Sequence, residues 1–320
     1  MFYTTKDIVL EFFRGDFFME IKTYNIDSSN IHLPKDSFIF DLETLGLSRQ
    51  YHEIILVGAM FWNEDKLILK QYFAHTRDEE ILILESFLAD ISDFKKAITF
   101  NSNSFDLPFL KSRLTHHKLK NLSDEVESFD LLARLKPLKN MMNLDSLKLK
   151  NIEKYFGIYR EDGISGKESV DLYKEFEVSF SDSLKDIILL HNKEDVHYLG
   201  ILTGKYNEFL DKLSINLNIS GENILARFLS CKFTSKLLTL SFSVETPLSH
   251  EVEFFGEGFF LYANKDSLKF EFPLSNIKDN DLTSTFWLYN ESLILKCQKE
   301  IFYNNIFFIL KNSIERSDLN

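Results

Sequence analysis

Hydrophobic positions in the first 140 residues form short apolar runs of the kind that build β-strands. We expect five strands, at residues 37–41, 53–63, 66–74, 97–101 and 127–136, the last passing into a helix near its end. Asn63 to Lys66 has the composition of a hairpin turn, so the first three strands are predicted to form an antiparallel meander.

Apolar residues spaced by three and four predict helices between and after these strands. The predicted helices cover residues 78–94, 106–117, 143–157 and 181–211. The resulting order is β-β-β-α-β-α-β-α-α. It predicts an α/β (α+β) fold with a mixed five-stranded sheet flanked by helices, rather than an all-parallel doubly wound sheet.

Both ends of the chain differ from this central pattern. Residues 1–34 are predicted to be a lead-in that contains an amphipathic helix from Lys6 to Phe13. Residues 222–240 fit one or two helices, and short β-type runs after Glu245 predict a small antiparallel sheet. The last twenty residues fit a strand or a helix. We therefore expect a domain at 35–210 and a β-leaning extension at 211–320.

Length and composition narrow the class of protein. A chain of 320 residues with 44% hydrophobic and 27% charged residues is globular and long enough for about two domains. Two cysteines exclude a disulfide framework and favour a reducing cytoplasm. No apolar run is long enough to span a membrane, and the N-terminus does not resemble a signal peptide. The net charge of −12 argues against a general phosphate-binding surface, although a local groove can still be basic.

Two acids at the end of the first central strand are the first chemical signal. Asp41 and Glu43 are two residues apart, so their side chains point the same way from a strand. Close carboxylates repel each other when both are ionised, and a hard divalent cation such as Mg²⁺ removes that cost. The alternative is a strand end where both acids face solvent.

Two later segments add acids. A buried strand ends at Asn101 and a helix begins near Asp106, whose carboxylate also suits a simple N-cap. His191 and Asp195 are four residues apart, so they lie on one helical face, where a surface pair is the alternative.

Together, these segments resemble the three motifs of the DEDD exonuclease superfamily, whose members share the ribonuclease H-like fold. The resemblance is strongest to the YprB-like ribonuclease H-like proteins of bacteria and covers about residues 35–210. It includes FDLLARL (129–135), SLKLKNIEKYFGIYREDGISG (146–166) and HNKEDV (191–196).

The resemblance implies a two-metal nuclease that acts as a 3′→5′ exonuclease on single-stranded DNA or RNA. Asp41, Glu43, Asp106 and Asp195 would hold two Mg²⁺ or Mn²⁺ ions about 3.5–4 Å apart. One ion would activate a water and the other would steady the leaving 3′ oxygen. His191 would act as the general base. The sequence departs from the family here, because the histidine has the three-residue separation from the last Asp that the tyrosine branch uses.

Other residues near these motifs are candidates for contact with the substrate. Asn101 and Phe105 are predicted to position it, with packing under the helix as the alternative for Phe105. Lys111 and Arg113 are predicted to touch the phosphate backbone, with an ordinary solvated charge as the alternative. Asn192 is a candidate to cap or orient Asp195. For Asp130, assistance to a metal, fixation of a neighbouring side chain and a structural role all stay open.

Two other functions stay open beside the exonuclease. A nuclease-like module that binds nucleic acid or protein without cleavage would not need four intact acids, and an endonuclease on structured nucleic acid could use the same acids. Gly-rich phosphate loops and the G-x-S-x-G motif do not occur, which disfavours a nucleotide-driven motor, a Rossmann dehydrogenase and an α/β-hydrolase. The extension at 211–320 is expected to serve as a substrate clamp, a dimer surface or a docking surface for a protein partner.

Overall fold

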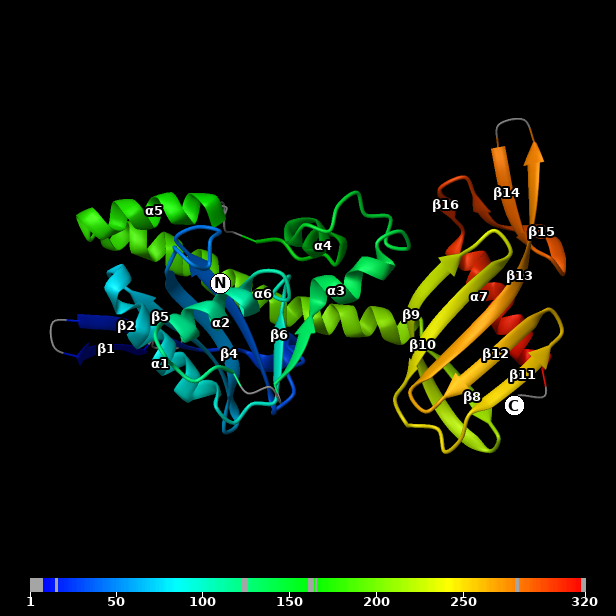
Figure 1. Cartoon of the computed structure of the whole chain (residues 1–320), viewed down its shortest axis with the longest axis horizontal. Coiled ribbons are helices and arrows are strands. Elements are labelled where there is room, and N and C mark those ends of the chain that lie inside the picture. The colour runs from blue at the N-terminus through cyan, green and yellow to red at the C-terminus, as the bar shows by residue number, and fades with distance from the viewer. Residues whose placement is uncertain are drawn as a thin grey trace. The chain divides into compact units, whose positions relative to one another are not determined.

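The computed structural model describes residues 8–14, 17–122, 126–160, 164, 166–279 and 282–317. The chain divides into two compact units. The first consists of residues 1–134 and 148–205, and the second of residues 135–147 and 206–320. Each unit has its own sheet (Figure 1).

Among the described residues of the first unit, seven strands form one mixed sheet in the order β1-β2-β5-β4-β3-β6-β7. The strands are β1 (Ile8–Arg14), β2 (Phe17–Asn25), β3 (Ser37–Thr44), β4 (Ile54–Asn63), β5 (Lys66–Ala74), β6 (Lys96–Thr99) and β7 (Glu127–Asp130). β6 and β7 run parallel to β3, and the other pairs are antiparallel. The predicted mixed sheet is confirmed. It also contains two strands from the segment that we predicted as a lead-in.

Helices cover both faces of this sheet, as Figure 1 shows. They are α1 (Glu80–Ile91), α2 (Asp106–His116), α5 (Gly166–Ser179) and α6 (Asp182–Lys212). α1 and α2 pack on one face through residues such as Phe87 and Phe109. α5 and α6 pack on the other through residues such as Phe176 and Ile188. Among the described helices, none combines the length and apolar character needed to cross a membrane.

The alternation of side chains along β3 decides which face carries the chemistry. Phe38, Phe40 and Leu42 enter the apolar core with α1 and α2. Asp41 and Glu43, at the intervening positions, therefore point to the face that α6 covers. The strand is apolar on one face and acidic at the end of the other.

Shorter elements join the main ones. They are η1 (Ser28–Asn30), η2 (Arg77–Glu79), α3 (Leu131–Leu135), η3 (Lys136–Leu138) and α4 (Leu149–Tyr155). The helix that we predicted at 143–157 is confined to α4, and it ends just before Gly157, which has a positive φ of 75°. α5 was not predicted, although its buried Ser169, Tyr173 and Phe176 follow helical spacing.

In the described part of the second unit, nine strands form an antiparallel sheet, with α7 (Tyr303–Glu315) as its C-terminal helix. The strands are β8 (Ile215–Ile219), β9 (Glu222–Phe233), β10 (Leu237–Val244), β11 (Val252–Gly256), β12 (Phe259–Asn264), β13 (Ser267–Asp279), β14 (Leu282–Trp287), β15 (Asn290–Cys297) and β16 (Glu300–Ile301). α7 buries Ile306, Ile309 and Leu310, and the ring of Phe307 lies 5.3 Å from that of Phe228 on β9. The β-leaning extension is confirmed as a sheet, and its ambiguous tail is a helix.

Two predicted helices are wrong. Residues 222–240 form all of β9 and the first half of β10, because Ile224, Ala226 and Phe228 are buried at every second position and Leu238 and Leu240 repeat that period. Residues 8–13 belong to β1, which pairs with β2, while residues 6 and 7 lie outside the described part of the chain. The apolar run at 8–13 fits either period, and pairing with β2 decides between them.

Gly58 on β4 allows α6 to approach the sheet closely. A Cβ at this position would lie 2.2 Å from Oδ1 of Asn192 and 2.9 Å from Cγ2 of Val196, both on α6. Gly58 is also the antiparallel partner of Asp41 in the β3–β4 pair. The missing side chain therefore leaves space directly beside the acidic end of β3.

We expect Gly58→Ala to lower the free energy of unfolding by about 1–3 kcal/mol, because the methyl group must displace α6 from β4. Urea unfolding followed by circular dichroism measures this change. Gly166→Ala is the matched control, because a Cβ at this exposed first residue of α5 meets nothing within 4 Å. Equal stability of the two variants would contradict the close packing of α6 on Gly58.

Candidate active site

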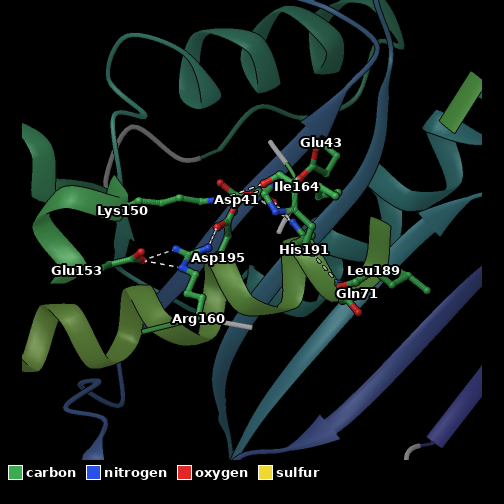
Figure 2. A network of polar contacts seen from close by, with 11 residues as sticks. Asp41, Glu43, Gln71, Lys150, Glu153, Arg160, Ile164, Leu189, His191 and Asp195 are labelled. Atoms are coloured by element: carbon green, nitrogen blue, oxygen red, sulfur yellow. Dashed lines mark hydrogen bonds and ion pairs between the residues drawn. The ribbon is translucent and has the colours of Figure 1, made fainter. Parts of the chain in front are cut away.

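The acidic end of β3 faces a histidine and an aspartate on α6, as Figure 2 shows. Nε2 of His191 lies 3.6 Å from Oε1 of Glu43 and 3.7 Å from Oδ2 of Asp195. Glu43 and His191 are buried, whereas Asp41 and Asp195 are partly exposed. Residues about 150 positions apart thus converge because α6 crosses the face of β3 that carries the acids.

Burial and mutual repulsion make these carboxyls weak acids. Burial, followed by the charges of Asp195, Asp106 and Glu43, raises the pKa of Asp41 well above its ordinary value. Burial also raises the pKa of Glu43 to about 7, against the opposing effect of His191. The four predicted acids therefore act on one another electrostatically, which places them in one neighbourhood.

Asp106 enters the site as the first residue of α2, after a turn that follows β6. Burial raises the pKa of Asp106 to about 7, and the charges of Asp130 and Asp195 act in the same direction. The turn is shaped by Asn101, whose positive φ of 64° is uncommon for a residue other than glycine. Asp106 therefore depends on an unusual backbone conformation for its position.

Asp130, at the end of β7, holds this turn in place. Its carboxylate accepts hydrogen bonds from the backbone N–H groups of Asn101 at 2.9 Å and Asn103 at 3.1 Å. It also accepts one from the N–H of Ala133 in α3 at 3.3 Å. Asp130 thus fixes the backbone that presents Asp106, which answers the open question about its position in favour of a structural role.

A chain of buried amides orients Asp41. Nδ2 of Asn192 donates to Oδ2 of Asp41 at 3.2 Å, and this contact lowers the pKa of Asp41 against the larger effect of burial. Nε2 of Gln71 on β5 donates to Oδ1 of Asn192 at 3.0 Å, and Tyr24 on β2 donates to Oε1 of Gln71 at 3.2 Å. We predicted that Asn192 orients Asp195, but the hydrogen bond from its side-chain amide is to Asp41.

A buried ion pair approaches Asp195 from the other side. Arg160, which follows α4, forms ion pairs with Asp195 and with Glu153 on α4. Its Nε donates to Oε1 of Glu153 at 2.9 Å (Figure 2). Burial raises the pKa of Glu153, although the contact with Arg160 acts in the opposite direction. Asp195 is therefore held by a cation that is itself partly balanced by a further carboxylate.

The donor atoms suit a hard divalent cation. Glu43, His191 and Asp195 each offer one ligand atom, and these atoms lie within 4.8 Å of one another. Carboxylate oxygens are the ligands that Mg²⁺ and Mn²⁺ prefer, and burial, together with the charges of neighbouring carboxylates, raises the pKa of Asp41, Glu43 and Asp106. The residues present therefore fit such an ion.

The predicted substrate contacts fall into three environments. Asn101 and Phe105 lie in the turn before α2, where the half-buried ring of Phe105 packs 5.4 Å from that of Phe109. Lys111 is exposed and lines a cavity of about 550 Å³ with Arg49. Arg113 is buried in an ion pair with Glu80 in which their closest atoms are 2.6 Å apart. The structure therefore leaves Lys111 available to a ligand and commits Arg113 to the core.

Sequence reasoning did not identify Gln71, Glu153 and Arg160. Gln71 follows Lys70 in an otherwise apolar stretch of β5, and its position is a usable signal because a fully buried amide needs partners. Glu153 and Arg160 lie in the segment 146–166 that carries the family resemblance. No predicted helix or strand contains both residues, so the sequence gives no reason to place them together. Only the fold shows that Arg160 contacts both Glu153 and Asp195.

The fold and the acidic site together define a ribonuclease H-like protein. The profile of the RNase_H superfamily matches residues 38–207, more than half of the chain, and the chain belongs to this superfamily. The predicted resemblance to YprB-like, ribonuclease H-like proteins is thereby confirmed.

Two proteins of similar sequence match about half of the chain. Uncharacterized protein YprB of Bacillus subtilis is 33% identical over 164 residues, which are 50% of this chain and 39% of YprB. Uncharacterized protein MJ0365 of Methanocaldococcus jannaschii is 27% identical over 167 residues, which are 49% of this chain and 88% of MJ0365. The chain thus spans well under half of the length of YprB.

Solved structures show weaker similarity. The family B DNA polymerase of Pyrobaculum calidifontis has a TM-score of 0.44 and 14% identity, covering 55% of this chain and 25% of the polymerase. Exonuclease I of E. coli in complex with single-stranded DNA has a TM-score of 0.32 and 13% identity, covering 66% of this chain and 55% of that protein.

We expect the free energy of unfolding, measured with a chelator present, to fall as the pH rises from about 4.5 to about 7. Glu43 has a pKa of about 7 in the folded protein against an ordinary value of 4.5, so the folded state binds its proton more tightly than the unfolded chain does. Glu43→Gln should remove on the order of 3 kcal/mol of this decline. Urea unfolding at pH 5, 6, 7 and 8 measures it.

Glu64→Gln, in the exposed β4–β5 turn, provides the control and should follow the wild type at each pH. A wild-type stability that increases over this pH range would show that the site does not hold carboxyls of raised pKa.

Proposed function

We propose that this chain is a metal-dependent nuclease that hydrolyses phosphodiester bonds, as a 3′→5′ exonuclease on single-stranded DNA or RNA. The observation that carries the proposal is the convergence of Asp41, Glu43, Asp106 and Asp195 beside His191 in a member of the RNase_H superfamily. Four acids whose charges repel one another destabilise a protein that gains nothing from them. Bound cations would offset this repulsion, whereas a module that binds nucleic acid without cleavage does not need the four acids.

The residues divide the chemistry between them. Asp41, Glu43, Asp106 and Asp195 would hold two Mg²⁺ or Mn²⁺ ions, which when bound would offset the charge of the phosphate and make water more acidic. Asn192 and Gln71 keep Asp41 in position. The turn that Asp130 fixes does the same for Asp106.

His191 is suited to the proton transfer. Its Nε2 lies between Glu43 and Asp195, and these carboxylates stabilise the imidazolium that forms when the ring accepts a proton from the attacking water. The oxygen of that water forms a new bond to phosphorus, the bond from phosphorus to the 3′ oxygen breaks, and a proton from solvent or from the imidazolium converts that oxygen into a hydroxyl. The products are a 5′-phosphate on the released nucleotide and a 3′-hydroxyl on the shortened strand.

The surface beside Asp106 suits a single strand. The cavity of about 550 Å³ is lined by Arg49 and Lys111, by the apolar Leu107 and Pro108, and by the polar Asn103, Ser112 and Thr115. Oγ of Ser112 donates to the carbonyl of Arg49 at 3.0 Å, which ties the loop after β3 to α2. Leu47 and Tyr51 are exposed on the same loop. Cations for phosphates and apolar groups for bases therefore occur together.

A nuclease-like module without activity and an endonuclease on structured nucleic acid are the alternatives. The same acids serve exonucleases and endonucleases, so only the products distinguish them. The extension after residue 211 is a further candidate surface for nucleic acid or for a protein partner.

We expect Asp41→Asn and Asp195→Asn each to reduce hydrolysis of 5′-labelled single-stranded DNA or RNA by about 10³-fold or more, because each removes a charged ligand from the proposed metal site. The assay resolves products of the wild type and the variants on a sequencing gel, with Mg²⁺, Mn²⁺ or EDTA. His191→Asn should reduce turnover by about 10²–10⁴-fold while metal binding persists.

Asp93→Asn is the matched control for these substitutions. Asp93 is exposed just before β6, at the opposite end of the parallel β3–β6 pair from Asp41, and its replacement should leave the rate unchanged. A ladder that shortens from the 3′ end supports the exonuclease, and internal cuts favour the endonuclease. A folded, metal-loaded wild type without activity on DNA or RNA would favour the binding module.

We expect the double variant Arg49→Ala and Lys111→Ala, made in the Asp41→Asn background, to bind single strands more weakly and with a lower salt dependence. Two lost phosphate contacts reduce the slope of log K against log salt by about 1.4 for a single strand. Fluorescence anisotropy at several salt concentrations measures both quantities. Lys66→Ala with Lys95→Ala removes the same charge from exposed positions at the opposite end of the central strands from Asp41 and serves as the control. If both double variants show the same salt dependence, Arg49 and Lys111 do not contact the phosphate backbone of the substrate.

A further inference from the structure

The contacts of Arg160 are unusual for a cation beside a proposed metal ligand. Its side chain is 5% exposed, and that of Glu153 is 2% exposed, so the pair is almost completely removed from water. Arg160 also lies over the ring of Tyr198 on α6, with its guanidinium carbon 5.6 Å from the ring centre. A guanidinium so enclosed has little freedom to reach a substrate, and its role must be exerted through Asp195.

Arg160 contacts one oxygen of Asp195 and leaves the other to the acids. Its Nη1 pairs with Oδ1, whereas Oδ2 lies 3.7 Å from Nε2 of His191. Oδ2 is therefore on the side where Glu43 and His191 offer their own ligand atoms. The contact with Arg160 selects the rotation of the Asp195 carboxylate, as partners behind a metal ligand commonly do.

The charge of Arg160 has an opposite consequence. A guanidinium on Asp195 lowers the attraction of that carboxylate for a second cation, and the low polarity of a buried site makes the effect larger than at the surface. Glu153 counters it, since its carboxylate pairs with the same guanidinium. The three groups Glu153, Arg160 and Asp195 together carry one negative charge, which is the charge of Asp195 alone.

We propose that Arg160 and Glu153 are positioning residues that act on the proposed metal site: Arg160 fixes the orientation of Asp195, and Glu153 balances Arg160 so that Asp195 keeps its affinity for a divalent cation. This inference rests on the proposed function, because it assigns the pair to the metal site of the nuclease. Under this proposal, Glu153 affects the affinity of the site for a divalent cation although it does not contact the cation.

The test is the dissociation constant for Mn²⁺, measured by isothermal titration calorimetry on the full chain at pH 8. Glu153→Gln leaves the charge of Arg160 unbalanced and should weaken Mn²⁺ binding about tenfold, at the lower end of the effect of such second-layer contacts. In Arg160→Gln the competing cation is lost, while the neutral amide can still donate to Oδ1 of Asp195 and keep its orientation, so Mn²⁺ binding should tighten severalfold. The double variant removes a neutral pair and should bind Mn²⁺ close to the wild-type affinity.

Two further variants separate charge from packing. Arg160→Lys keeps the positive charge and should bind Mn²⁺ close to the wild-type affinity. Glu177→Gln and Arg77→Gln disrupt an exposed ion pair of the same type in the same unit, in which Nε of Arg77 lies 2.8 Å from Oε1 of Glu177, and should leave Mn²⁺ binding unchanged. Thermal unfolding checks that each variant is folded. If Glu153→Gln does not fold, the comparison of Arg160→Gln with the double variant tests the proposal instead.

Opposite shifts for Glu153→Gln and Arg160→Gln, with recovery in the double variant, support the proposal. A purely structural pair would weaken Mn²⁺ binding in both single variants, and that result would overturn it, as would two unchanged constants. If the wild type binds Mn²⁺ and degrades nucleic acid, but Glu153→Gln and Arg160→Gln have the same dissociation constant for Mn²⁺, only this inference is overturned. A wild type that binds no divalent cation overturns the proposed function as well.

Discussion

Repulsion among carboxylates gathered at the end of β3 is the constraint on which the first unit depends. Burial and the neighbouring charges hold the pKa of Glu43 and Asp106 near neutrality, so each group resists ionisation in its place. The surrounding structure compensates with specific contacts. Asn192 donates to Asp41, Asp130 fixes the turn before Asp106, and Arg160 pairs with Asp195. Three of the four acids thus have their own support, and each support comes from a different segment of the chain.

The sequence predicted the acids because local rules governed them. Alternation along one strand gave Asp41 and Glu43 a common direction, and helical spacing put His191 and Asp195 on one face. The five central strands were predicted for the same reason, since each contains a short apolar run of the kind that builds a β-strand. Where a single element determined the geometry, the sequence was sufficient.

The remainder depended on tertiary contacts that no local pattern contains. The run at 8–13 became a strand because β2 was available to pair with it. Arg113 appeared to be a phosphate contact, but the buried Glu80 captures it. Arg160 reaches Asp195 only because the segment after α4 returns to α6. In each case the outcome was decided by a partner distant in sequence, and single-sequence reasoning has no means to choose that partner.

The pairing of β2 with β5 affects how far the chain can be shortened. Tyr24 on β2 closes the amide chain that reaches Asp41 through Gln71, and β2 also covers the backbone edge of β5. A minimal fragment that started at residue 35 would keep all four acids and yet expose that edge to another copy of itself. Such fragments invite edge-to-edge association. β2 therefore keeps the edge of β5 paired within the same chain, although it carries none of the proposed metal ligands.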